Sequence, residues 1–159
     1  SYVPVGRLVK EGGMRAVREY YSSLGTEFTS ALKEMIVFDA LICNTDRHYG
    51  NFGVLVDSHT NKIVAPAPLF DHGNSLFNLA GEENWTNKNV LQEYVKTLFP
   101  CVYEDFITEA KAVMDERIRV KVRKILTVEV KKSGRYNYSD KKLKLMSEIV
   151  RERAKILLE

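Results

Sequence analysis

Apolar residues recur along much of this chain at helical spacing. Residues 14–24 show the mixture of apolar and polar positions that predicts a helix, and Gly25 is placed to end it. Residues 27–43 predict a second helix, with Thr26 as a candidate N-cap. The second helix is apolar nearly all round, which is typical of a helix buried in the middle of a domain.

The pattern changes after this helix. The polar stretch NTDRHYGN (44–51) predicts a loop, and FGVLVD (52–57) and IVAPA (63–67) predict two strands joined by a turn. Pro66 and Pro68 limit the second strand to an edge or to a short ladder, because proline cannot donate a hydrogen bond to the next strand. Residues 52–67 are therefore expected to form a hairpin.

The helical pattern returns in the second half of the chain. The remainder, residues 86–158, predicts four helices: 86–98, 103–114, 116–131 and 139–158, the last capped by Ser139. No repeat and no linker rich in proline, glycine or serine divides the chain. The sequence thus predicts one domain, residues 1–159, mainly α with a small β-hairpin.

Composition narrows the class of protein. The chain has 159 residues, 45% hydrophobic and 28% charged, which suits a single globular domain. Apolar runs such as Met35 to Phe38 are too short for a transmembrane helix, and the N-terminus has no apolar signal-peptide region. Cys43 and Cys101 lie far apart without a CxxC pair, so a reducing, cytoplasmic location is expected rather than a disulfide scaffold or zinc site.

The positive charge is unevenly spread. Lys and Arg number 24 against 21 Asp and Glu, a net charge of +3, and the surplus gathers in residues 117–124 and 131–135. Such a run suits a nucleic acid, a membrane surface or an acidic partner. Acidic residues flank it, which favours a solvated helix face.

Three oxygen-bearing side chains stand in the loops that flank the predicted hairpin: Asp46, Asn51 and Asp71. A hairpin returns the chain close to its starting point, so these side chains are expected to converge. Mg²⁺ prefers oxygen ligands, usually one or two carboxylates together with substrate phosphates. Asn51 and Asp71 are therefore candidate metal ligands, and Asp46 is a candidate to orient or deprotonate an attacking hydroxyl, as phosphoryl transfer requires.

The spacing of these residues adds specificity. Asp46 and Asn51 form D-x4-N, the interval of the protein-kinase catalytic loop, and Asp-His-Gly at 71–73 follows the two strands as a D-x-G metal motif does. The alternative is that these Asx residues only cap turns. The combination of both motifs with two intervening strands favours the kinase-like interpretation.

NTDRHYGNFGVL (44–55), followed by PLFDHGNSLF (68–77), resembles the C-terminal lobe of HipA-like kinases, whose loop has the form N-x-D-x-H-x-x-N. The resemblance includes the preceding helix segment KEMIVFDALIC and covers residues 27–80 well. D-R-H-x-x-N also resembles the loop of phosphatidylinositol kinases. The His-Arg-Asp order of eukaryotic protein kinases is absent, which favours the HipA-like branch.

The resemblance implies a role for each matching residue. Asp46 matches the catalytic aspartate, while Asn51 and Asp71 match the residues that bind magnesium and the ATP phosphates. His48 matches the loop histidine, which is expected to brace the loop, although a histidine can also act as a catalytic base. Arg47 is expected to pair with Asp71, to lie near phosphate or substrate, or to stay on the surface.

A kinase of this kind also needs a glycine-rich loop and a strand lysine, and neither is found in this sequence. The residues before Asp46 are too few and too helical for an N-terminal lobe. We therefore expect a protein-kinase-like C-terminal lobe from which the N-terminal lobe is absent. On its own, such a lobe is expected to be inactive.

The resemblance implies ATP and Mg²⁺ as cofactors and a protein Ser/Thr hydroxyl as the substrate. A lipid or small-molecule kinase is one alternative. A non-catalytic binding module is another, because HipA-like proteins of toxin–antitoxin systems bind DNA-binding antitoxin partners. Direct binding of nucleic acid is not expected, since no DNA-binding motif is present and the net charge is modest.

Overall fold

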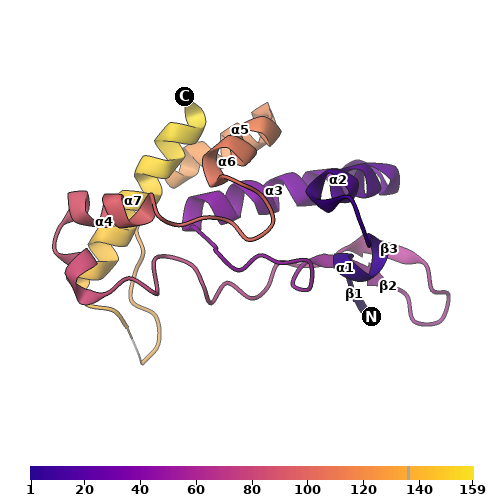
Figure 1. The fold of residues 1–159 in the computed structure, drawn as a ribbon, viewed down its shortest axis with the longest axis horizontal. Coiled ribbons are helices and arrows are strands. Elements are labelled where there is room, and N and C mark those ends of the chain that lie inside the picture. Colours follow the sequence, from indigo (N-terminus) through magenta and orange to yellow (C-terminus); the bar gives the residue numbers. More distant parts are fainter. Residues whose placement is uncertain (136) are drawn as a thin grey trace.

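The computed structural model describes residues 1–135 and 137–159. Helices dominate it, as the sequence predicts (Figure 1). The elements are β1 (Tyr2–Pro4), α1 (Val5–Leu8), α2 (Gly13–Leu24), α3 (Thr26–Ile42), β2 (Gly53–Val56), β3 (Ile63–Pro66), a 3₁₀ helix η1 (Glu82–Trp85), α4 (Lys88–Val95), α5 (Phe106–Val113), α6 (Glu116–Ile125) and α7 (Asp140–Leu158). No helix among the described residues is both long and apolar enough to cross a membrane.

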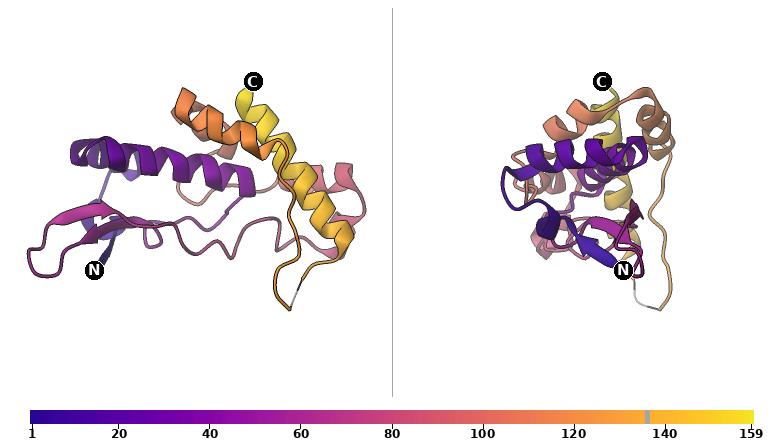
Figure 2. Two further views of the ribbon diagram at one scale, coloured as in Figure 1. Left: turned by 180° about the vertical axis from the view of Figure 1, so that it is seen from behind. Right: turned by 90° about the vertical axis from the view of Figure 1, so that its right-hand side faces the viewer.

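Helix α3 is the central element, as its apolar pattern predicts. It contacts α2, α5, α7 and β3, so it connects the sheet end of the molecule with the helical end (Figures 1 and 2). Its buried side chains face several directions and include Phe28, Leu32, Met35, Ile36, Val37, Ala40 and Leu41. The helix ends at Cys43, which adopts a left-handed conformation with a φ of 52°. This sharp end directs the chain into the 44–51 loop.

The predicted hairpin is part of a three-stranded antiparallel sheet of order β1-β2-β3. β1 pairs with β2 through Tyr2 opposite Leu55 and Pro4 opposite Gly53. A Cβ on Gly53 would lie 2.1 Å from the carbonyl oxygen of Val3, so only glycine permits this close approach. β3, which contains Pro66, lies at the edge as expected.

Several predicted boundaries need correction. Thr26 lies inside α3, whose N-cap is Gly25. The helix expected at 86–98 is shorter and follows η1, and the one expected at 103–114 begins only after its cap, Asp105. α6 ends at Ile125 rather than 131, just before a stretch rich in β-branched residues that lose side-chain freedom in a helix. Ser139 caps α7 as predicted.

The two cysteines differ sharply in environment, and we expect them to differ in reactivity. Cys43 is buried, and burial raises the pKa of its thiol to about 11. Cys101 is exposed. Because the thiolate is the nucleophile, a thiol reagent at pH 8 should modify Cys101 quickly and Cys43 only after unfolding. A Cys101→Ser variant should lose the fast reaction, and two fast-reacting thiols in the folded protein would contradict this assignment.

Candidate functional site

A buried carboxylate lies in the middle of α3. Asp39 is fully buried, although the residues around it in the helix are apolar. Its partner is Arg47 of the 44–51 loop, which is also buried. Arg47 Nε donates to Asp39 Oδ2 at 2.8 Å, and Arg47 Nη2 donates to Oδ1 at 2.9 Å. This bidentate ion pair compensates both buried charges and attaches the loop to α3.

The remaining donors of Arg47 reach two further parts of the site. Nη1 donates to the carbonyl oxygens of Asn51 at 3.2 Å and Phe70 at 2.8 Å. Nη2 lies 3.1 Å from Nδ1 of His72. A guanidinium has five N–H donors and no acceptor, so His72 Nδ1 accepts here and all five donors are used. Arg47 therefore joins α3, the 44–51 loop and the D-x-G segment.

These contacts correct the expectation for Arg47. Its ionic partner is Asp39 rather than Asp71, and its side chain is buried rather than on the surface. With every N–H already donated, the guanidinium has none left for a phosphate. Arg47 acts here by holding other residues in place.

Asn44 secures the start of the loop. Its Nδ2 donates to Asp39 Oδ1 at 3.1 Å, and its Oδ1 accepts from the backbone N–H of Asp46 at 3.1 Å. The side chain is completely buried, so both hydrogen bonds are shielded from water. Asp46 is thereby fixed through its backbone. Within the described residues, its half-buried carboxylate has no hydrogen-bond or ion-pair partner.

Asn51 is held by one end of its amide only. Its Nδ2 donates to the carbonyl oxygen of Asp46 at 2.7 Å. Its Oδ1 is buried without a hydrogen-bond partner in the described structure. A buried oxygen without a partner is costly and calls for an explanation such as a missing ion or ligand. The amide nitrogen fixes the orientation of the group, and its oxygen is left without a donor among the described residues.

The D-x-G segment lies beside the end of α3 and the start of the loop. The backbone N–H of Thr45 donates to Asn74 O at 3.0 Å, and that of Leu76 donates to Ile42 O at 2.7 Å. Asp71 lies between Phe70 and His72, both of which contact Arg47. The two loops that flank the hairpin thus meet in space.

Asp71 itself is exposed and adopts the left-handed conformation, with a φ of 58°. Aspartate tolerates this region better than most residues, because its short polar side chain can make local hydrogen bonds. Its carboxylate has no partner among the residues that the structure describes. It is therefore free to bind a cation.

His48 braces the loop, as its match in the resemblance implies. It is exposed, and its Nδ1 accepts a hydrogen bond from the backbone N–H of Gly50 at 3.0 Å. The hydroxyl of Tyr2, in β1, donates to Gly50 O at 2.9 Å. The sheet and the histidine together support the turn that leads to Asn51.

The donor set fits a magnesium ion. Asn51 and Asp71 offer an amide oxygen and a carboxylate, which are hard ligands. The unpartnered Oδ1 of Asn51 is the observation that tests this fit independently of the motif. In residues 1–135 and 137–159 no group of three or more His, Cys, Asp or Glu side chains is arranged to hold a metal. The expected site depends on an asparagine and, in phosphoryl transfer, on substrate phosphates.

Sequence reasoning missed Asp39 as the anchor of the site. A signal was present, because Asp39 is the one carboxylate in the apolar stretch 35–42 of α3 and a buried carboxylate needs a cation as partner. No sequence pattern predicts the contact between His72 and Arg47, because this contact depends on the path of the chain after β3.

Comparisons with known proteins address the fold. No family model and no curated protein matches this chain. The crystal structure of a Helicobacter pylori proinflammatory kinase, CtkA, is similar, with a TM-score of 0.55 and 21% sequence identity. The similarity covers 82% of this chain and 56% of the CtkA chain, so the present chain corresponds to little more than half of that structure. The chain therefore has a kinase-like fold.

Proposed function

We propose that this chain provides the catalytic and metal-binding part of an ATP- and Mg²⁺-dependent HipA-like kinase that phosphorylates a Ser or Thr hydroxyl of a protein. One observation carries the proposal. In the part of the chain that the structure describes, the carboxylates of Asp46 and Asp71 and the Oδ1 of Asn51 have no partner. They occur in D-x4-N and D-x-G order on two loops joined by Arg47. The kinase-like fold supports it.

Each residue has a definite task in this proposal. Asn51 and Asp71 hold the metal, which neutralises charge on the ATP phosphates when it is bound. Asp46 accepts the hydrogen bond of the attacking hydroxyl and receives its proton. Its backbone is fixed through Asn44 and Asn51, so the carboxylate needs little reorganisation.

The rest of the nucleotide site is proposed to lie outside this chain. A glycine-rich loop and a lysine that contacts the phosphates complete such kinases. The comparison is consistent with this division, because the similarity leaves much of the CtkA chain unmatched. The proposed activity therefore belongs to the complete parent protein, and these 159 residues alone should transfer phosphate slowly or not at all.

The test uses the complete protein that contains this chain. Asp46→Asn and Asp71→Asn should each reduce the transfer of γ-phosphate from ATP by about 10²-fold or more, because each removes a carboxylate from the reacting centre. Asp57→Asn is the matched control, since Asp57 is a carboxylate in the turn between β2 and β3. It should retain activity.

Full transfer by either site variant would refute the proposed roles. If the parent protein neither transfers phosphate nor binds ATP in a Mg²⁺-dependent way, the proposal fails as a whole. The kinase-like fold would then serve a non-catalytic binding module.

A further inference from the structure

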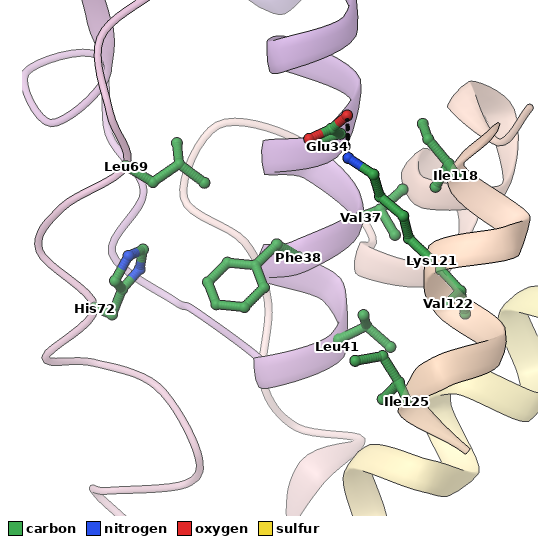
Figure 3. Close-up of a pocket in the computed structure, with 10 residues that line it drawn as sticks. All are labelled: Glu34, Val37, Phe38, Leu41, Leu69, His72, Ile118, Lys121, Val122 and Ile125. Carbon is green, nitrogen blue, oxygen red and sulfur yellow. Dashed lines mark hydrogen bonds and ion pairs between the residues drawn. The ribbon is translucent and has the colours of Figure 1, made fainter. Parts of the chain in front are cut away.

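An apolar groove lies beside the D-x-G segment. We call it the Phe38 groove: a cavity of about 450 Å³ with walls from α3, α6 and residues 69–72 (Figure 3). Val37 and Leu41 of α3 lie toward Val122 and Ile125 of α6, whereas the ring of Phe38 points away from α6, toward His72. Small-molecule sites in proteins are typically concave, mainly apolar and about 300–1,000 Å³ in volume, and the groove has these properties.

The groove exists because α3 is apolar on a face that the described elements leave partly uncovered. Phe38 remains 40% exposed and Leu69 remains 38% exposed, although both lie beside the core. The ring of Phe38 contacts that of His72 edge-on, with centroids 5.3 Å apart. A second cavity of about 430 Å³ begins at the side chains of Phe38 and His72 and continues toward Val130, Lys131 and Tyr138. Exposed apolar surface of this extent, rimmed by polar groups, usually marks a binding site.

Charged side chains close one end of the groove. Glu34 of α3 pairs with Lys121 of α6 at 2.8 Å and also with Arg117. Figure 3 shows Lys121 crossing from α6 to Glu34. These ion pairs tie the two helices together, so a polypeptide cannot run through this end without breaking them. The closed end favours a short ligand.

The charged side chains at the Glu34 end of the groove also determine which charge the ligand should carry. Two cations share one carboxylate, which leaves a surplus of positive charge beside apolar walls. Burial acts to raise the pKa of Glu34, but the hydrogen bonds from Lys121 and Arg117 outweigh it and leave that pKa lowered. Glu34 is therefore ionised at neutral pH. Asp115 lies close to Arg117 and pairs with Lys33, so this ion-pair cluster holds three cations and two carboxylates, an excess of one positive charge. An anionic group complements this charge, whereas a cationic group would be repelled.

We propose that the Phe38 groove binds a small amphiphilic carboxylate, with its aliphatic or aromatic body against Phe38 and Val122 and its carboxylate at Lys121. Leu69 and His72 line the groove on either side of Phe70 and Asp71. A bound molecule thus contacts the segment that carries a candidate metal ligand, and is placed to regulate it. Only this regulatory consequence rests on the proposed kinase function; binding itself does not.

Dodecanoate is the probe, titrated below its micelle concentration into the 159-residue chain without ATP or metal. Calorimetry should show one saturable site, and amide shifts in NMR spectra should gather on α3, α6 and residues 69–73. Dodecyltrimethylammonium, with the same chain length and opposite charge, should bind more weakly. Because no nucleotide is present, the result is independent of the kinase proposal.

Two variants test the two halves of the ligand. Lys121→Gln should weaken dodecanoate binding about tenfold, which is the loss expected for a charge-assisted hydrogen bond. The same variant should not weaken the binding of dodecyltrimethylammonium. Lys124→Gln is the matched control, because Lys124 is exposed on the same helix and does not line the groove. Leu69→Trp fills the groove and should abolish binding of both probes.

Absence of saturable binding, or equal dodecanoate affinity in Lys121→Gln and the unaltered chain, would overturn the proposal. Dimerisation of the chain that is lost in Leu69→Trp would also overturn it and assign the groove to a second copy. Thermal unfolding of each variant verifies that it is folded. If Leu69→Trp fails to fold, the comparison of Lys121→Gln with Lys124→Gln still decides the result.

Discussion

Replacing Arg47 by methionine is expected to lower the free energy of unfolding by about 3–5 kcal/mol, because Asp39 is left buried and charged without its partner. The carbonyl oxygens of Asn51 and Phe70 also lose their donor. Urea denaturation of the 159-residue chain measures the change. In a thermal scan the midpoint should fall by roughly 10 °C.

Two further variants make this result specific. Arg47→Lys retains the charge but offers three donors for five contacts, so an intermediate loss of stability is expected. Arg123→Met removes the exposed pair with Glu116, which should cost less than about 1 kcal/mol. If Arg47→Met were as stable as Arg123→Met, the buried pair would not have the anchoring role assigned to it.

A double variant separates stability from the arrangement of the site. Asp39→Leu with Arg47→Met replaces the buried pair by apolar side chains, which often recovers much of the stability lost in the single variant. It does not restore the hydrogen bonds that join Asn51 to Phe70. We therefore expect the double variant to be more stable than Arg47→Met, but to bind Mn²⁺, the probe for the proposed Mg²⁺ site, more weakly than the unaltered chain does. Recovery of Mn²⁺ binding together with stability would show that Arg47 does not position the metal ligands.

The helices were the most predictable part of the fold, because their evidence is local. The apolar pattern of 27–43 and the glycine at 25 are sufficient to place α3 within a residue or two. β1 was missed for the opposite reason. Its three residues carry little strand signal, and its partner β2 lies some fifty residues later in the chain, so only the folded chain brings them together.

The site divides in the same way. The order D-x4-N and D-x-G is visible in the sequence and identifies Asp46, Asn51 and Asp71. The contacts that hold these residues in place cannot be predicted from the sequence, because several acidic residues lie near Arg47 in the chain and any of them is a possible partner. Only the path of α3 selects Asp39. The sequence therefore indicates the chemistry, whereas the relative positions of the groups depend on tertiary contacts.

Asn51→Ala is expected to weaken Mn²⁺ binding by about tenfold or more while changing the stability of the metal-free chain by less than about 1 kcal/mol. The variant loses the hydrogen bond from Nδ2 to Asp46 O. It also removes Oδ1, which is buried without a partner and already costs free energy. The two effects oppose each other in the metal-free protein. In the metal-bound protein, Oδ1 is proposed to be a ligand, so its removal only weakens binding.

Asn44 provides the matched control, because it is the same residue type, equally buried and only seven positions earlier. Both ends of its amide are hydrogen-bonded, to Asp39 and to the backbone of Asp46. Asn44→Ala should therefore destabilise the metal-free chain by about 2 kcal/mol. Thermal unfolding with and without Mn²⁺ distinguishes the two asparagines: metal should raise the midpoint of Asn44→Ala by more than that of Asn51→Ala. An equal rise in both variants would remove Asn51 from the metal site, because its free oxygen would then contribute nothing to binding.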